Sequence, residues 1–179
     1  MKTSDGSPLL IAFAGPPCAG KSTLADDLAR RLGVPCLSMD ATRRRILPDA
    51  AHTREDRKAA YRAMHFAAEL LLQTGSSVIL DAPYGHAEDR IGLARIVEVG
   101  RARLCLVECR ISPETAARRL AQRGFDPDRP DLTEGIVAQA AREYPYTNAG
   151  LLLDMDSLRP EDAIRLVSEY LNSSRVPVL

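Results

Sequence analysis

The chain has 179 residues, of which 45% are hydrophobic and 27% are charged. This composition is typical of a folded globular domain, and it excludes disordered, collagenous and disulfide-scaffold proteins. The 24 basic and 24 acidic side chains give a net charge of zero, so no overall charge attracts the chain to nucleic acid.

The apolar runs and the cysteines predict the cellular compartment of the protein. The longest apolar runs fall far short of the roughly 20 residues that span a bilayer, so we expect no membrane partner. No small-residue cleavage site follows the first run, which predicts a cytoplasmic protein without a signal peptide. The four cysteines lack zinc-site spacing. We expect reduced thiols in or beside the core, with metal ligands or a redox pair as the alternative.

Short apolar segments alternate with longer segments of helical period. In chain order the pattern predicts a strand at Leu9–Ala14, a helix at Ser22–Leu32, a strand at Pro35–Met39, a helix at Glu55–Gln73, a strand at Ser77–Leu80, a helix at His86–Val99, a strand at Arg103–Cys109, helices at Glu114–Arg123 and Leu132–Glu143, a strand at Gly150–Leu153 and a helix at Pro160–Asn172. Five strands interleaved with helices predict an α/β fold with a doubly wound, five-stranded parallel sheet. We expect one domain over residues 1–179, with residues 1–8 as a flexible tail.

The turn between the first strand and the first helix carries the most specific motif. It reads Gly15-Pro16-Pro17-Cys18-Ala19-Gly20-Lys21-Ser22, which fits G-x-x-x-x-G-K-[ST] in full. In this P-loop the glycines let backbone N–H groups wrap the phosphates of a nucleoside triphosphate, and the helix N-terminus adds partial positive charge. Lys21 supplies a point charge, and the Ser22 hydroxyl can bind Mg²⁺.

A carboxylate, Asp40, follows the second predicted strand. Ligands of an open parallel sheet bind at the carboxyl ends of the strands, so Asp40 should face the phosphates. It could take the proton from an acceptor hydroxyl, and Arg43, one helical turn on, could hold an anionic substrate group or the transferring phosphoryl. The alternative is that Asp40 only caps a helix that begins near Thr42.

Two apolar runs end in an aspartate, as a Walker B strand does. These are Val78-Ile79-Leu80-Asp81 and Leu151-Leu152-Leu153-Asp154. The acid of such a strand holds Mg²⁺ directly or through water. We prefer Asp81, because a strand that follows a long crossover more often neighbours the first strand. Asp154 is the alternative.

An arginine-rich stretch at about residues 118–131 is the third element. It contains Arg118, Arg119, Arg123 and Arg129. A glycine and two prolines bracket a short loop there, as a lid requires. An arginine brought over the γ-phosphate would offset charge that develops in the transition state. The alternative is a set of exposed helix arginines paired with Asp126 and Asp128.

Together these motifs resemble the small P-loop kinases that include chloramphenicol phosphotransferase, zeta toxin and the kinase domain of polynucleotide kinase. The resemblance covers about residues 9–170 and rests on Gly15–Thr23, Asp40-x-x-Arg43, Val78–Ala82 with Arg90 downstream, and Arg118–Arg123 before the lid. It implies nucleotide binding by the P-loop through Thr23, with Asp40 as general base and Arg43 on substrate or phosphate. The lid arginine that clamps the phosphates corresponds best to Arg123, with Arg119 second.

We therefore expect an enzyme, an ATP- and Mg²⁺-dependent kinase that transfers the γ-phosphate to a hydroxyl of a small molecule such as an antibiotic, a nucleoside or a sugar. ATP is favoured over GTP because the sequence has no N-K-x-D guanine motif. The alternatives are a polynucleotide 5′-hydroxyl kinase, which the neutral charge disfavours, and a sugar-nucleotide kinase like zeta toxin. A switch ATPase is less favoured, because Ala82 rather than glutamate follows Asp81. The identity of the acceptor and the oligomeric state stay open.

Overall fold

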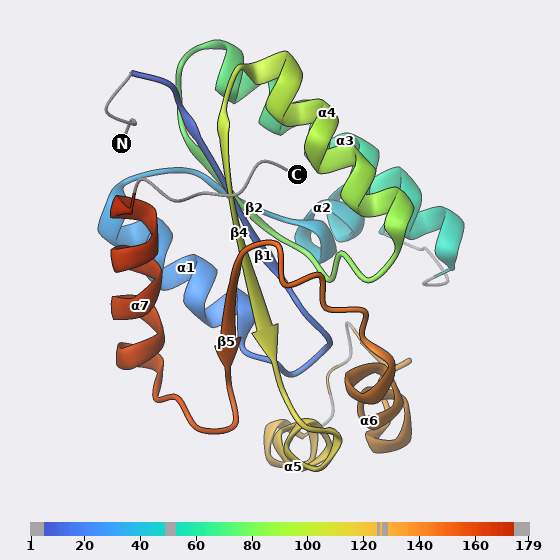
Figure 1. Cartoon of the computed structure of the whole chain (residues 1–179). Coiled ribbons are helices and arrows are strands. Elements are labelled where there is room, and N and C mark those ends of the chain that lie inside the picture. The colour runs from blue at the N-terminus through green and yellow to red at the C-terminus, as the bar shows by residue number, and fades with distance from the viewer. Residues whose placement is uncertain (1–5, 49–52, 125, 127–128, 174–179) are drawn as a thin grey trace.

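A five-stranded parallel sheet runs through the centre of the molecule (Figure 1). The computed structural model describes residues 6–48, 53–124, 126 and 129–173. The strands are β1 (Leu9–Ala14), β2 (Cys36–Ser38), β3 (Val78–Asp81), β4 (Arg103–Arg110) and β5 (Leu151–Asp154), in the order β2-β3-β1-β4-β5. The helices are α1 (Lys21–Leu32), α2 (Met39–Ile46), α3 (Arg54–Gln73), α4 (Ala87–Gly100), α5 (Pro113–Arg123), α6 (Glu134–Glu143) and α7 (Pro160–Asn172). The predicted doubly wound α/β fold is confirmed.

Helices cover both faces of the sheet (Figure 1). Alternate residues of a strand point to opposite faces, so Leu9, Ile11 and Phe13 of β1 join one core cluster with α1 and α7. Leu10 and Ala12 join a second cluster with α3 and α4. The whole of β1 is therefore buried, as its continuous apolar sequence predicts. Helices α5 and α6 lie together beyond the carboxyl ends of β4 and β5 (Figure 1).

The sheet register brings three strand ends to one edge. Asp81 at the end of β3 pairs with Phe13 of β1 on one side and with Ser38 of β2 on the other. The P-loop leaves β1 at this edge, and α2 begins there directly after β2. Parallel pairing thus collects the P-loop, Asp40 and Asp81 in one place.

Helix α2 differs from the prediction. The strand predicted at Pro35–Met39 is only Cys36–Ser38, because the chain turns into α2 at Met39. The Ser38 hydroxyl is the N-cap and accepts a hydrogen bond from the Ala41 N–H at 3.5 Å. The alternative in which Asp40 caps a helix starting near Thr42 is therefore wrong, and Asp40 lies inside the first helical turn.

All four cysteines are free thiols. Cys105 and Cys109 are buried in β4, whereas Cys18 and Cys36 are half-buried. Burial raises the pKa of Cys36 and of Cys109 to about 12, so these thiols stay protonated and unreactive at neutral pH.

The structure describes part of the predicted N-terminal tail and part of the predicted lid. Of the tail predicted at residues 1–8, residues 1–5 lie outside the described residues, and the Pro8 carbonyl accepts a hydrogen bond from the Arg103 N–H at 2.9 Å. Of the predicted lid, residues 125, 127 and 128 lie outside them, which includes the Asp128 of the pairing alternative. Within the described ranges, no helix combines the length and the apolar character needed to cross a membrane.

Candidate active site

The P-loop is a tight backbone cradle. Gly15 has φ of 142°, and a Cβ there would meet the Cys109 carbonyl oxygen at 2.5 Å. Gly20 has φ of 89° and forms the N-cap of α1. Cys18 has φ of 63°, which is costly for a residue with a side chain. Residues with positive φ let a loop before a helix wrap around a phosphate and offer it backbone N–H groups.

Lys21 folds back over this cradle. Its Nζ donates a hydrogen bond to the Pro16 carbonyl oxygen at 2.8 Å, and only 9% of the residue is exposed. A buried ammonium at the N-terminus of α1 makes the loop a concentrated positive site. Thr23, in the first turn of α1, lines an adjoining hollow.

Asp81 lies beside this positive site and is 6% exposed. Burial raises the pKa of its carboxyl, while the charge of Lys21 and a hydrogen bond from the Ser22 hydroxyl act in the opposite direction. A hydroxyl oxygen and a carboxylate oxygen beside a phosphate cradle fit the ligand set that Mg²⁺ takes from a protein. Ser22 and Asp81 could therefore hold Mg²⁺.

Asp154 is placed differently. It ends the edge strand β5, where its side chain is 44% exposed and pairs with Arg110 at 3.4 Å. Strand β3 neighbours β1, as we predicted from the long crossover. Of the two Walker B candidates, Asp81 is the one beside the P-loop.

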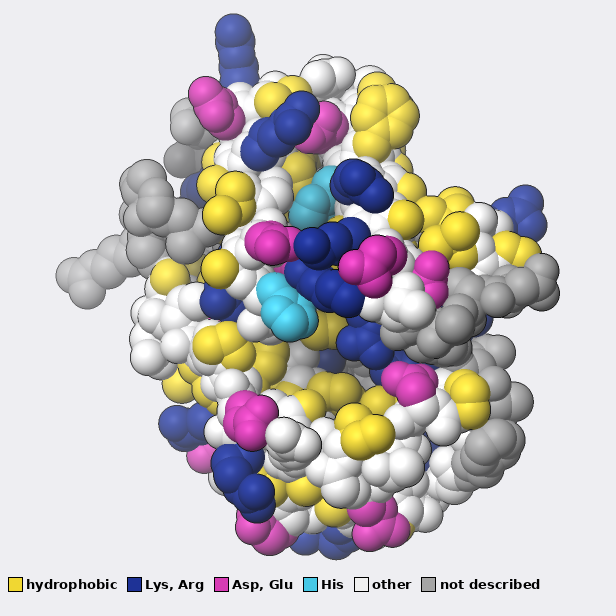
Figure 2. Space-filling view, turned by 90° about the vertical axis from the view of Figure 1, so that its right-hand side faces the viewer, with side chains coloured by type: hydrophobic (Ala, Val, Ile, Leu, Met, Phe, Trp, Pro, Cys, Tyr) yellow, Lys and Arg dark blue, Asp and Glu magenta, His cyan; other side chains and the backbone are white. Residues whose placement is uncertain are grey.

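A cavity of about 340 Å³ opens in front of the P-loop. Lys21, Ser22, Asp40 and Asp81 all line it. Its other walls come from the first turns of α3 and α4, from α6 and from the lid. On the face shown in Figure 2, basic side chains gather above a hollow and apolar side chains lie below it.

Arg129 connects the lid to Asp40. Its Nη1 donates to Asp40 Oδ2 at 2.9 Å, while its Nε and Nη2 donate to the two carboxylate oxygens of Asp131 at 3.1 and 3.3 Å. The Arg129 side chain is only 14% exposed. The two carboxylates raise the pKa of Arg129, although its burial acts against them. Of the arginines in the stretch at 118–131, Arg129 is the one that touches Asp40.

Arg43 and Arg123 are placed differently from Arg129. Arg43 is 3% exposed and is not among the described residues that line the cavity. Arg123 lines the cavity, but its side chain is 58% exposed and forms an ion pair with Asp126. The structure thus brings Arg123 to the rim and leaves Arg43 inside the protein.

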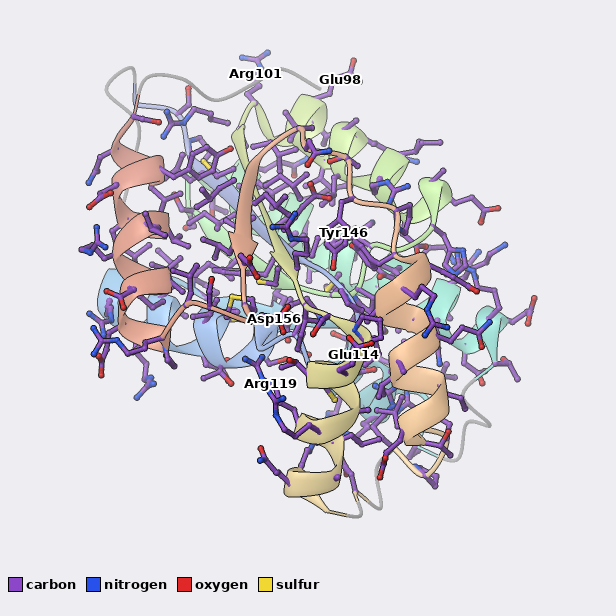
Figure 3. The ribbon with its side chains drawn as sticks, turned by 60° about the horizontal axis from the view of Figure 1, so that its bottom comes forward. Glu98, Arg101, Glu114, Arg119, Tyr146 and Asp156 are labelled. Atoms are coloured by element: carbon purple, nitrogen blue, oxygen red, sulfur yellow. The ribbon has the colours of Figure 1, made fainter. Side chains whose placement is uncertain are left out.

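Arg119 bridges the P-loop to the segment after β5. Its Nη1 donates to the Cys18 carbonyl oxygen at 3.2 Å, and its Nη2 donates to the Met155 carbonyl oxygen at 2.6 Å. Figure 3 shows the side chain extending from α5 toward that segment. Beside it lies a hollow of about 460 Å³, whose lining includes Gly20, Met155 and Pro160.

A match to a protein-family model shows the family of this chain. The model of the AAA_33 family, described as an AAA domain, matches residues 10–145. The chain belongs to this AAA-domain family. The match covers the P-loop, Asp40, Asp81 and the lid.

Sequence relatives and solved structures resemble this AAA domain over most of its length. Uncharacterised proteins of Mycobacterium tuberculosis and Mycobacterium bovis are 28% identical over 157 residues, and the match covers 81% of this chain and 31% of theirs. The chain thus spans about a third of the length of these curated relatives. The Mycobacterium tuberculosis APS kinase CysC, solved with AMPPNP and APS, has a TM-score of 0.73 at 20% identity, covering 93% of this chain and 99% of that one.

A gluconokinase from Sinorhizobium meliloti 1021 has a TM-score of 0.68 at 18% identity, covering 92% of this chain and 91% of that one. At these identities the two structures show a shared fold. The AAA domain therefore has the fold of P-loop kinases.

Sequence reasoning missed an ion pair in the cavity of the AAA domain. Arg54 begins α3, and its two terminal nitrogens donate to the two carboxylate oxygens of Asp89 in α4 at 3.1 and 2.9 Å. The Asp89 side chain is 5% exposed. Both residues lie in the first turn of a helix at the carboxyl edge of the sheet. That position was the sequence signal from which the ion pair could have been predicted.

The loop between β3 and α4 is held from several sides. Tyr84 has φ of 51° and is fully buried. Its N–H donates to the Tyr61 hydroxyl at 2.9 Å, and its carbonyl accepts from Arg90 at 2.7 Å. The Tyr144 hydroxyl donates to the neighbouring Pro83 carbonyl at 2.5 Å. These contacts fix the cavity wall that follows Asp81.

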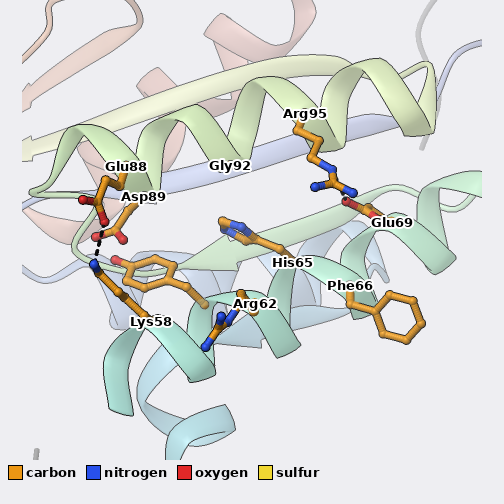
Figure 4. A pocket seen from close by; sticks show the side chains of 10 residues that line it. Lys58, Arg62, His65, Phe66, Glu69, Glu88, Asp89, Gly92 and Arg95 are labelled. Atoms are coloured by element: carbon orange, nitrogen blue, oxygen red, sulfur yellow. Dashed lines mark ion pairs between the residues drawn. The ribbon is translucent and has the colours of Figure 1, made fainter. Parts of the chain in front are cut away.

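A groove lies between α3 and α4, the helix that follows this loop (Figure 4). His65 fills a slot opposite Gly92, where a Cβ would meet the ring at 2.6 Å. The His65 Nε2 is 3.2 Å from the Tyr84 hydroxyl, and the two rings stack at 6.0 Å. We conclude that His65 supports the wall of the cavity.

Proposed function

We propose that this AAA domain is a Mg²⁺-dependent kinase that transfers the γ-phosphate of ATP to a hydroxyl of a small molecule. One observation carries the proposal: the P-loop lysine, the Mg²⁺ ligand candidates Ser22 and Asp81, and the carboxylate Asp40 all line the same cavity. Phosphate binding and a proton acceptor in one cavity are what phosphoryl transfer needs. The kinase fold of the solved neighbours supports it.

The nucleotide has a place on the far side of the P-loop. The 460 Å³ hollow beside Arg119, Thr23 and Met155 opens from the same loop and suits the nucleoside of ATP. Arg119 would hold the loop against the segment after β5 there. An APS kinase of the same fold was solved with AMPPNP, which supports nucleotide binding by this chain.

In the proposed reaction Asp40 accepts the proton of the acceptor hydroxyl. The hydroxyl oxygen forms a bond to the γ-phosphorus, the bond from that phosphorus to the β-phosphate oxygen breaks, and ADP leaves. Lys21 and the backbone N–H groups of the P-loop balance the charge of the phosphates. Mg²⁺, when bound at Ser22 and Asp81, would neutralise charge on the β- and γ-phosphate oxygens.

A small acceptor suits the cavity better than a polymer does. About 340 Å³ is the lower part of the range of small-molecule sites. The net charge of zero offers no general attraction to nucleic acid. A cytoplasmic location, and membership of the group that includes chloramphenicol phosphotransferase and zeta toxin, belong to the same proposal.

Transfer of labelled γ-phosphate from Mg·ATP tests the proposal. The acceptor panel holds nucleosides, sugars, a sugar nucleotide, hydroxylated antibiotics and a 5′-hydroxyl oligonucleotide. We expect label in a small molecule, and a loss of about 100-fold or more in Lys21→Ala. Arg118→Ala is the control, because Arg118 is an exposed residue that bonds to Thr115 within its own helix and is not among the described residues that line either cavity.

Three other outcomes would change the assignment. Label only in the oligonucleotide would indicate a polynucleotide kinase, and label only in the sugar nucleotide would indicate a zeta-toxin-like enzyme. Free phosphate that no acceptor influences would contradict the kinase and leave a switch ATPase.

A further inference from the structure

The end of the cavity that faces away from the P-loop has two unlike walls. One wall comes from the first turns of α3 and α4 and is polar, with Arg54, His86 and Asp89. The opposite wall comes from α6 and the residues beside it and is mostly apolar, with Leu132, Ile136 and Tyr144. An acceptor that reaches Asp40 lies between these walls.

The charge of Arg54 in the polar wall is already neutralised by carboxylates of the protein. Arg54 and Asp89 form the bidentate pair described above, and Glu88 lies 3.6 Å from the same guanidinium. Because Asp89 is 5% exposed, taking Arg54 from it would leave a buried carboxylate without its partner. That change is strongly unfavourable.

The lid side of the cavity is neutralised in the same way. Arg57 lies 3.4 Å from Asp131, which also accepts from Arg129. Arg129 in turn donates to Asp40. Glu143 of α6 adds a further carboxylate to the lining, so the described residues that line the acceptor end carry no excess of positive charge.

An anionic acceptor would therefore bind at a disadvantage. Its negative group would have to displace a carboxylate from an arginine or lie unpaired beside Asp131 and Glu143, and both alternatives are unfavourable. An uncharged acceptor leaves the Arg54–Asp89 and Arg57–Asp131 pairs in place. Its hydroxyl and other polar groups could still form hydrogen bonds with the nitrogen and oxygen atoms of these ion pairs.

The apolar wall provides the binding surface for such a molecule. Ile136 is 48% exposed, although large apolar side chains favour burial, and it lines the cavity together with Leu132, Ala140 and Tyr144. Covering this surface with an apolar part of the acceptor would remove it from water.

From these observations we infer that the acceptor is an uncharged hydroxyl compound with an apolar face. The apolar face packs on Ile136 and its neighbours, and a hydroxyl points across the cavity to Asp40. This inference rests on the proposed function and narrows it to a substrate class.

Ligand-observed NMR binding to the chain with Mg·AMPPNP present tests the inference. The probes share one ring: 1,4-benzenedimethanol is neutral, 4-(hydroxymethyl)benzoate is an anion and 4-(hydroxymethyl)benzylammonium is a cation. Erythritol is a neutral polyol without an apolar face. We expect the neutral diol to bind at least about tenfold more tightly than each of the other three, a difference near 1.4 kcal/mol.

Two variants test whether binding of the diol depends on the apolar wall. Ile136→Asp should weaken binding of the diol about tenfold, whereas Ile91→Asp should not, because Ile91 is an exposed isoleucine of α4 that is not among the residues lining the cavity. Thermal unfolding of both variants checks that they are folded. Preference for the benzoate, the benzylammonium or erythritol, binding of none of the four, or diol binding that Ile136→Asp leaves unchanged would overturn the inference.

The binding readout separates this inference from the kinase itself. A chain that binds the neutral diol through Ile136 but never transfers phosphate would contradict the proposed function and leave the inference about the site standing. A chain that phosphorylates anionic acceptors and binds the benzoate best would do the opposite.

Discussion

The Arg129 guanidinium donates to Asp40 Oδ2 at 2.9 Å, across 89 residues of sequence. Asp40 is the proposed general base, so its carboxylate is held by a cation where it must later accept a proton. The same guanidinium holds Asp131 through two further bonds. Phosphates in the cavity would compete with both carboxylates for Arg129, and their binding would therefore release Asp40.

This competition predicts that Asp40 opposes nucleotide binding. Asp40→Asn should bind AMPPNP about three- to tenfold more tightly than the wild type, because a carboxylate near the phosphates is removed and Arg129 is freed. Isothermal titration calorimetry measures this change. In an Arg129→Gln background the gain should shrink, since the partner is gone. Equal gains in both backgrounds would show that Arg129 plays no part.

Arg119 should matter for the nucleotide far more than its neighbour. Arg119→Ala removes two hydrogen bonds that join the P-loop to the segment after β5, and we expect AMPPNP affinity to fall about tenfold. Arg118→Ala is the control, because Arg118 bonds to Thr115 within its own helix. Similar affinities of the two variants would contradict the assigned nucleotide side.

Two helical glycines should respond in opposite ways to alanine. Gly92→Ala should lower the free energy of unfolding by about 1–2 kcal/mol, since its Cβ would meet the His65 ring at 2.6 Å. Gly135→Ala in α6 should raise it by about 0.5 kcal/mol, because the nearest atom to its Cβ is 4.0 Å away. Urea unfolding measures both. A stabilising Gly92→Ala would mean that His65 is free to move.

His65 should make stability depend on pH. Burial lowers its pKa to about 4, against the raising effect of Asp89. Between pH 6.5 and 4 the unfolded chain binds a proton at His65 that the folded chain does not bind, so the folded state loses stability as the pH falls through this range. Relative to His65→Phe, the wild type should lose about 2 kcal/mol between pH 7 and 4.5. A difference that stays constant with pH would contradict the buried neutral ring.

Much of the site could be predicted from local sequence. The P-loop follows a buried strand and opens a helix, and the parallel sheet places the ends of β1, β2 and β3 at one edge. The neighbourhood of Gly15, Asp40 and Asp81 follows from that topology alone. The start of α2 was missed because Pro35–Met39 reads as a strand, while the Ser38 hydroxyl caps a helix instead.

The contacts between distant segments could not be predicted. Arg129 reaches Asp40, and Arg54 reaches Asp89, only after the lid and the helices pack around the cavity. Arg43 has the spacing of a substrate contact, yet α2 turns it into the protein interior. Helix geometry places side chains on faces, but packing decides which face meets the cavity.

The most direct test of the account measures binding and transfer together in Asp40→Asn, using the acceptor that the panel identifies. With Mg·ATP bound and a single turnover observed, we expect transfer at least about 100-fold slower than in the wild type, while AMPPNP affinity is about three- to tenfold higher. That split would identify Asp40 as the group that accepts the hydroxyl proton. Transfer at the wild-type rate in Asp40→Asn would contradict the account.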